Sequence, residues 1–125
     1  MNPGDLADAY LRHFATKRGE DLWAFEKVNE LVSRDANDGW QITRILVNDA
    51  SSDEALAYVA AGPLEDLLKK HGPAVIGWVE EESRLNDRLR LALSGVWLRR
   101  DDPTWHRWYS LMWEYGFAEG KRMPL

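Results

Sequence analysis

Apolar residues recur at intervals of three and four along almost the whole chain, and this periodicity is the strongest constraint on its fold. Leu6, Tyr10 and Phe14 show the spacing near the N-terminus. It returns in the segments 22–32, 42–46, 56–59, 64–68, 75–79, 89–97 and 105–115. Such spacing places side chains on one face of an α-helix. No segment alternates with a period of two, so we predict an all-α fold without a sheet.

Helix end signals divide these segments into about seven short helices. Gly19 is expected to end the first helix, and Asp38, Ser52 and Asn86 to cap later ones. The last helix is expected to begin around 101–103 and to end near Gly116. The short connections predict antiparallel hairpins of consecutive helices.

Two glycine–proline pairs, Gly62-Pro63 and Gly72-Pro73, are expected to separate helices in the middle of the chain. The glycine can close one helix in a left-handed conformation, and the proline suits the first turn of the next. Between the pairs, Glu65 and Asp66 lie four residues before Lys69 and Lys70, which predicts two ion pairs along one helix.

A weak internal repeat adds a second hypothesis about topology. Segments 39–49 and 77–87 share Gly, Trp, Asn and Asp at matched positions, 38 residues apart. This offset is near the ~40-residue period of HEAT-like helical pairs. The sequence thus allows a small HEAT-like superhelix, with chance similarity as the alternative.

Length and composition predict one domain spanning residues 1–125. The chain has no cysteine, which excludes disulfides and thiolate metal sites. Its acidic, amphipathic N-terminal stretch does not resemble a signal peptide, and no apolar run reaches the ~20 residues that span a bilayer. We therefore expect a cytoplasmic protein without membrane contact.

The formal charge is −5, from 16 Lys and Arg against 21 Asp and Glu. A negative charge argues against sequence-independent binding of nucleic acid, which depends on phosphate neutralisation. The basic stretch that includes Arg84, Arg88, Arg90, Arg99 and Arg100 is interrupted by acidic residues, so solvated helix surface explains it better than a nucleic-acid site.

The stretch from about Trp40 to Trp97 carries a recognisable pattern. It runs Trp-x-Ile, then Ala-Gly-Pro-Leu-Glu-Asp-Leu-Leu, then His-Gly, formed here by Trp40, Ile42, Ala61, Gly62, Pro63, Leu64, Glu65, Asp66, Leu67, Leu68, His71 and Gly72. In this pattern the chain resembles an uncharacterised family of small all-helical bacterial proteins of unknown function. The resemblance implies an all-helical fold and no particular activity.

Catalytic and metal motifs are absent from the sequence. His13, His71 and His106 are far apart and form no metal-binding motif, and there is no nucleophile elbow or phosphate-binding glycine loop. His71 could act as an acid–base group beside Glu65 and Asp66, but its position favours contact with the carbonyls at its own helix C-terminus. We predict no catalytic residue, no metal and no cofactor.

The residues Glu80, Glu81 and Glu82 form the densest acidic cluster. Successive helical residues point about 100° apart, so three carboxylates cannot converge on one metal. Glu80 is expected to pair with Arg84 on a solvated face. The alternative is an acidic surface for a basic partner, with Glu80 and Glu81 as partner-binding residues.

The segment 103–117 is the most unusual in the chain. Its apolar residues cover roughly 200° of a helical wheel, twice the stripe of about 100° that one-sided packing needs. Either this helix is buried on two sides or part of its aromatic face meets a partner. The candidate partner-binding residues are Trp105, Trp108, Tyr109 and Trp113.

These observations favour a protein-binding module that acts by surface complementarity, with an immunity, antitoxin or adaptor role in a bacterium. The partner would be another protein or a second copy of the chain. The alternative is a small enzyme or small-molecule-binding domain with a pocket between helices. A deep apolar pocket would favour the alternative, and a flat aromatic patch the binding module.

Overall fold

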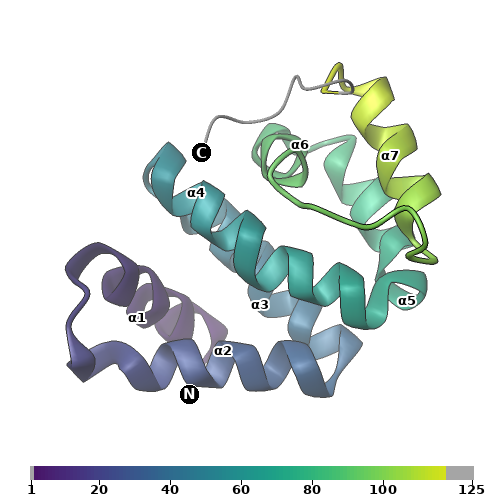
Figure 1. The fold of residues 1–125 in the computed structure, drawn as a ribbon. Coiled ribbons are helices and arrows are strands. Elements are labelled where there is room, and N and C mark those ends of the chain that lie inside the picture. The colour runs from purple at the N-terminus through teal and green to yellow at the C-terminus, as the bar shows by residue number, and fades with distance from the viewer. Residues whose placement is uncertain (1, 118–125) are drawn as a thin grey trace.

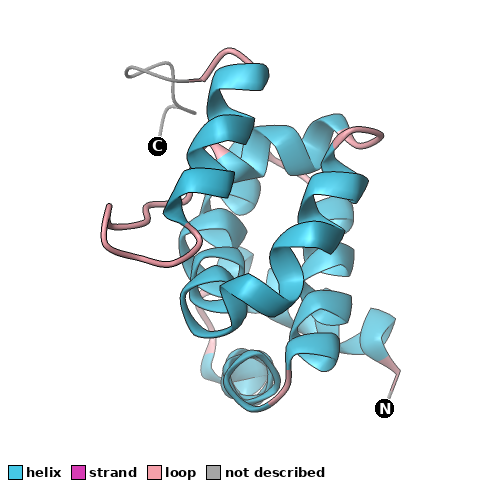
Figure 2. Cartoon of the chain, turned by 90° about the vertical axis from the view of Figure 1, so that its right-hand side faces the viewer, coloured by secondary structure: helices cyan, strands magenta, loops and turns pink. Residues whose placement is uncertain are grey.

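The periodic segments form helices in the structure, a computed structural model that describes residues 2–117 (Figures 1 and 2). The α-helices are α1 (Pro3–Thr16), α2 (Leu22–Arg34), α3 (Ala36–Asp49), α4 (Asp53–Val59), α5 (Glu65–Ser83), α6 (Asp87–Leu93) and α7 (Trp105–Glu114). A 3-10 turn, Gly19–Asp21, precedes α2. Residues 2–117 contain no strand, which confirms the all-α prediction.

Helices α1, α2 and α3 pack against one another, and α4 to α7 build the other side of the molecule (Figure 1). The core between them contains fully buried aliphatic side chains, among them Leu46, Leu56, Leu64, Leu67 and Ile76. Helix α7 follows a long loop and packs against α5, at the opposite side of the fold from α1 and α2 (Figure 1).

Three of the expected helix ends are confirmed. The side chain of Ser52 accepts a hydrogen bond from the Ala55 N–H at 3.0 Å, and that of Asn86 accepts one from the Leu89 N–H at 3.1 Å. Gly116 has φ +81° and follows the last turn of α7. Short polar caps and a left-handed glycine satisfy backbone groups that have no partner within the helix.

Two other expected helix ends are wrong by a few residues. Helix α1 ends at Lys17, a non-glycine residue with φ +59°, and not at Gly19. The Lys17 N–H donates to the His13 carbonyl at 2.8 Å, which supports this left-handed cap. Helix α3 is capped by Asp35, whose carboxylate accepts from the Asp38 N–H at 2.9 Å, so Asp38 lies in the first turn.

The chain does not break at Gly62-Pro63. A π-helical turn, Ala60–Leu64, joins α4 to α5, and the Glu65 N–H donates to the carbonyl of Ala60, five residues back. Proline has no N–H and its ring clashes with the carbonyl four residues before it in a regular α-helix. One widened turn removes both conflicts, so Gly62 needs no left-handed conformation.

At Gly72-Pro73 the helix bends and continues. His71 has non-helical angles, φ −131° and ψ 20°, inside α5. Gly72 is not left-handed either, and its role is steric. A Cβ atom at this position would lie 1.9 Å from Oγ1 of Thr104, a buried residue just before α7. Glycine therefore permits the loop that leads into α7 to lie against α5.

The weak internal repeat has a counterpart in the packing. Arg44 Nε lies 3.5 Å from Glu82 Oε2, and Asn86 Nδ2 donates to Asn48 Oδ1 at 2.9 Å. Both pairs join positions 38 residues apart, the first between α3 and α5 and the second between α3 and the cap of α6. The HEAT-like topology stays a prediction.

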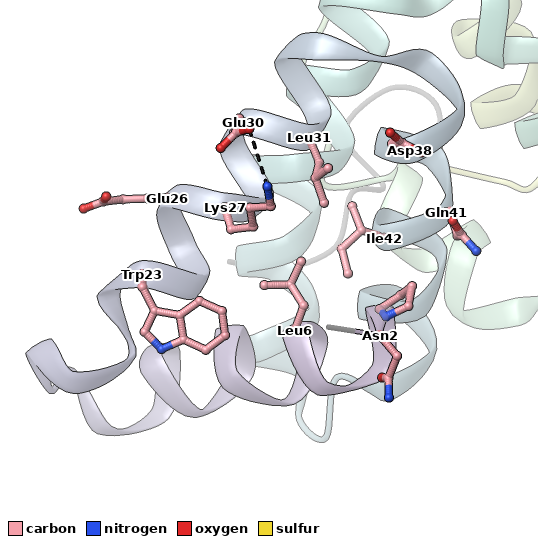
Figure 3. Close-up of a pocket in the computed structure, with 11 residues that line it drawn as sticks. Asn2, Leu6, Trp23, Glu26, Lys27, Glu30, Leu31, Asp38, Gln41 and Ile42 are labelled. Carbon is pink, nitrogen blue, oxygen red and sulfur yellow. Dashed lines mark hydrogen bonds and ion pairs between the residues drawn. The ribbon is translucent and has the colours of Figure 1, made fainter.

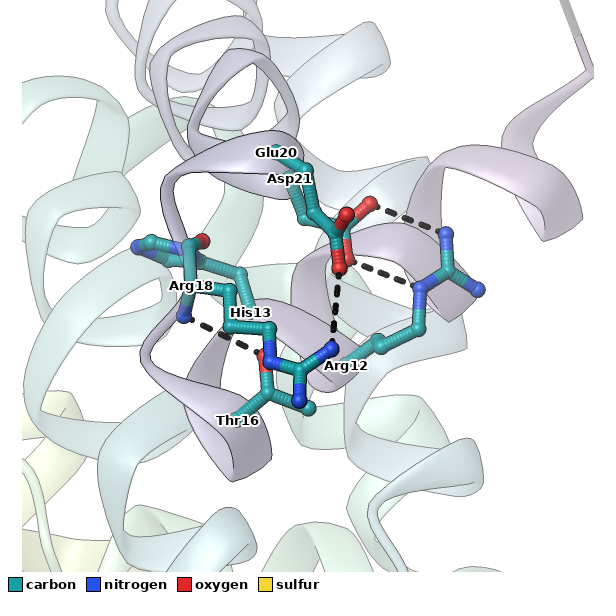
Figure 4. Close-up of polar contacts among 6 residues, drawn as sticks. All are labelled: Arg12, His13, Thr16, Arg18, Glu20 and Asp21. Atoms are coloured by element: carbon teal, nitrogen blue, oxygen red, sulfur yellow. Dashed lines mark hydrogen bonds and ion pairs between the residues drawn. The ribbon is translucent and has the colours of Figure 1, made fainter.

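A polar corner joins α1 to α2 (Figure 4). Arg12 donates two hydrogen bonds to the buried carboxylate of Asp21, at 2.8 and 3.0 Å. Arg18 and Glu20 form a looser ion pair at 3.8 Å beside it. The hydrogen bonds from Arg12 hold the pKa of Asp21 below its usual value.

The steric role of Gly72 predicts a contrast with Gly62. We expect Gly72→Ala to destabilise the fold by about 1–3 kcal/mol, because the added methyl group collides with Thr104. The same change at Gly62 meets only the Tyr10 hydroxyl at 3.6 Å, so we expect no loss of stability there. Chemical denaturation of both variants measures the difference, and equal effects would show that Thr104 does not confine Gly72.

The lowered pKa of Asp21 predicts a dependence of stability on pH. The ionised carboxylate stabilises the fold fully above its unfolded pKa of about 4, and this contribution is lost as pH falls through the lower folded value. Wild type should therefore melt above Asp21→Asn at pH 7, and the gap should narrow as pH falls below about 4. Glu81→Gln, which removes an exposed carboxylate, is the control. A gap that is independent of pH would contradict this account.

Candidate functional site

The inner face of α7 belongs to the core. Trp108, Leu111 and Met112 are buried, and Trp108 is only 3% exposed. Its indole N–H donates to the Leu93 carbonyl at the end of α6, at 3.0 Å. This bond satisfies the polar atom of a large buried aromatic residue. Among the predicted partner-binding residues, Trp108 is thus a packing residue in this conformation.

Polar contacts fix α7 to the second half of α5. Arg107 binds the carboxylate of Glu80 through two nitrogens, with Nε at 3.0 Å. The hydroxyl of Tyr115 lies 2.6 Å from Ser83 Oγ. The expected pair of Glu80 with Arg84 is wrong, because Arg107 takes Glu80 while Arg84 lies 4.0 Å from Glu114. Glu80 thus serves the α5–α7 contact.

An aromatic stripe lies outside this contact. It consists of Trp105, Tyr109 and Trp113, one helical turn apart along α7. The rings of Trp105 and Tyr109 are stacked at 4.5 Å, and those of Tyr109 and Trp113 meet edge to face at 6.4 Å. Arg100 lies over the Trp105 ring at 5.3 Å. Trp113 is 56% exposed, while the other two rings are half-buried.

The wide apolar arc of α7 therefore divides in two. Its inner part packs in the core, and Trp113 faces solvent. A helical wheel cannot show this division, because it does not reveal where the neighbouring helices lie.

Glu81 lies in a different place from Glu80. It borders a shallow hollow of about 250 Å³ between α3 and α5, which is lined by Trp40, Trp78, Glu81, Glu82 and Leu85. Leu85 is 91% exposed there. The structure thus separates the two predicted acidic residues, one in an ion pair with α7 and one beside this hollow.

A cavity between α1, α2 and α3 is one that sequence analysis missed (Figure 3). This α1–α2–α3 groove has a volume of about 520 Å³. It is lined by Asn2, Pro3 and Leu6 of α1 and its cap, Trp23, Glu26, Lys27, Glu30 and Leu31 of α2, and Asp38, Gln41 and Ile42 of α3. Trp23 was the available signal, since it falls outside the apolar stripe of its helix.

Two of the histidines, His13 and His71, contact backbone carbonyls. His71 Nε2 lies 2.9 Å from the Val32 carbonyl, in the last turn of α2. We expected His71 to contact carbonyls at the end of its own helix, and it contacts a carbonyl at the end of another helix instead. His13 Nδ1 similarly contacts the carbonyl of Arg18 at 2.9 Å. Within residues 2–117, no three His, Asp or Glu side chains are placed to share a metal ion. No helix in this range could cross a membrane.

Two titratable groups near the start of α5 have shifted pKa values. Partial burial, reinforced by the charge of Glu65, raises the pKa of Asp66. Burial also raises the pKa of Tyr10, with a further contribution from Tyr58. The expected Glu65–Lys69 pair is present at 3.1 Å, while Lys70 instead donates to Ser33. Neither Asp66 nor Tyr10 lines the α1–α2–α3 groove.

The two faces of α7 should respond differently to truncation. We expect Trp108→Ala to cost about 3–5 kcal/mol of folding stability, because it leaves a cavity and removes the hydrogen bond to the Leu93 carbonyl. Trp113→Ala should cost about 1 kcal/mol or less, since more than half of its side chain already faces solvent. Urea unfolding of both variants measures these values. A larger loss at Trp113 than at Trp108 would contradict the assigned faces.

Comparison with known sequences identifies the group to which this chain is related. A sequence profile for a family of unknown function (DUF6869) matches residues 13–114. Curated proteins and solved structures gave no match. The matched range includes α2 to α7 and the whole aromatic stripe, and it confirms the expected resemblance to an uncharacterised family. The chain therefore belongs to DUF6869, a family whose function is unknown.

Proposed function

We propose that this chain is a protein-binding module and that the aromatic stripe of α7 is its binding surface. The observation that carries the proposal is the exposure of Trp113 beside Trp105 and Tyr109 on a helix whose opposite face is buried. A tryptophan that is 56% exposed in the free chain leaves a large apolar area in water, and a partner could remove that area from solvent.

The composition of the stripe supports this proposal. Tryptophan, tyrosine and arginine are the residue types that most often dominate binding energy at protein interfaces. Here Arg100 lies over Trp105, and Tyr109 packs between the two tryptophans. These ring contacts restrict the side chains before binding, so less conformational entropy is lost when a partner docks.

The attachment of α7 also supports a preformed surface. The Arg107–Glu80 and Tyr115–Ser83 contacts join the helix to α5 on the side away from Trp113. An immunity, antitoxin or adaptor protein would use such a surface by shape and charge complementarity. The net charge of −5 favours a basic partner in each case.

The α1–α2–α3 groove supports a second candidate, a small-molecule-binding domain. Its volume of about 520 Å³ lies in the range of known ligand pockets. This groove does not include any residue of the aromatic stripe, so the two candidates can be tested separately.

Partner recovery from the native host tests the first proposal. Tagged wild-type protein should enrich one specific partner, and Trp113→Ala should lose it by tenfold or more, as expected for an interface anchor worth about 1.4 kcal/mol or more. Trp78→Ala is the matched control. Trp78 is another exposed tryptophan, but it lies on α5 beside the hollow next to α3 and not in the aromatic stripe of α7.

Thermal melting of the same variants separates binding from folding. Trp113→Ala and Trp78→Ala should both melt close to wild type. Recovery of the same partner by wild type and Trp113→Ala would contradict the assigned surface. Absence of any enriched partner and of self-association in sedimentation experiments would contradict the protein-binding function.

A further inference from the structure

The α1–α2–α3 groove combines an apolar floor, an open aromatic ring and an acidic rim (Figure 3). We propose that it binds a small organic cation, namely an ammonium group carried on a short hydrocarbon. This site is separate from the aromatic stripe and does not depend on the protein-binding function.

The floor of the groove suits a hydrocarbon. Leu6 and Ile42 present buried side chains from α1 and α3, and Leu31 adds a half-buried one from α2. Burial of methylene groups is favourable, so a short alkyl chain gains affinity from this floor. The groove's volume of about 520 Å³ accepts a small molecule as a whole.

Trp23 supplies a site for positive charge. It is 42% exposed, and within residues 2–117 it has no hydrogen bond, no stacked ring and no cation over its face. Figure 3 shows its indole at one end of the groove, beside Leu6. Ammonium groups are attracted to the face of an aromatic ring, and tryptophan is the strongest of the natural rings.

The charges around the groove favour the same ligand. The residues that line it include the acidic Glu26, Glu30 and Asp38 and the basic Lys27, with the Glu26 carboxylate directed away from the other lining side chains (Figure 3). Lys27 lies 3.5 Å from Glu30, and Arg34 pairs with both Glu30 and Asp38. Glu26, one turn from Trp23, has no ion pair within residues 2–117. The lining therefore has a net negative charge that disfavours anionic ligands.

Three probes of equal chain length test the charge preference. Hexyltrimethylammonium, hexan-1-ol and hexanoate share the hydrocarbon and differ only in the head group. In NMR titrations that follow the indole N–H of Trp23, we expect the cation to bind about fivefold more tightly than the alcohol, and hexanoate to bind most weakly.

Variants of the lining residues identify the source of this preference. Trp23→Leu keeps an apolar surface and should abolish the advantage of the cation over the alcohol, measured by calorimetry or by shifts of other groove residues. Glu26→Gln should weaken cation binding about twofold, and the exposed Glu54→Gln on α4 serves as the control. Lys27→Met removes the like charge and should strengthen cation binding.

Four outcomes would overturn the proposal. Equal binding of the three probes would show a purely apolar groove. Tighter binding of hexanoate that is lost in Lys27→Met would show an anion site. Tighter binding of a short lysine-containing peptide than of the free cation would identify a protein segment as the occupant. Absence of binding by every probe would show that the groove is not a ligand site.

Discussion

The buried hydrogen bond from the Trp108 indole to the Leu93 carbonyl fixes the orientation of α7, and the functional proposal depends on that orientation. Trp108 is the largest aromatic residue on the inner face, and its N–H needs a partner once it leaves water. Trp113 lies five positions further along the helix, about 140° around it from Trp108, and so points away from the face that packs in the core. The exposure of Trp113 is thus a consequence of where Trp108 is anchored.

The close approach of the chain at Gly72 supports the same arrangement. Thr104 directly precedes α7, and the absence of a side chain at residue 72 lets it pack against α5. The Arg107–Glu80 ion pair then attaches the first turns of α7 to α5, and Tyr115 attaches its end through Ser83. If either the Arg107–Glu80 or the Tyr115–Ser83 contact were lost, the other would still join α7 to α5. A side chain at residue 72 would displace the Thr104 loop, which positions α7 for both contacts.

The fold class followed from the sequence because helical periodicity is a local property that tertiary packing here reinforces. The caps at Ser52 and Asn86 were equally local, since one side chain binds a backbone N–H three residues later. Gly62 and Gly72 misled the prediction, because a glycine marks either a left-handed turn or a close contact, and only the folded neighbours decide which. Lys17 was missed because a left-handed lysine has no sequence mark.

The binding candidates were harder to predict than the helices. The aromatic stripe was visible as an excess of large rings in 103–117, but its division into core and surface required the positions of α5 and α6. The α1–α2–α3 groove joins residues from three helices, so no single segment could reveal it. Its one local sign, Trp23 outside the apolar stripe, is meaningful only when the space between the helices is known.

Hydrogen exchange of the indole N–H groups tests the central claim, that α7 buries Trp108 and presents Trp113. NMR resolves these groups individually in a chain with seven tryptophans. The account predicts that the Trp108 N–H exchanges only when the fold opens, because it is buried and bonded to Leu93, and that the Trp113 N–H exchanges rapidly. Rapid exchange at Trp108 with protection at Trp113 in the free protein would contradict the assigned faces and, with them, the proposed binding surface.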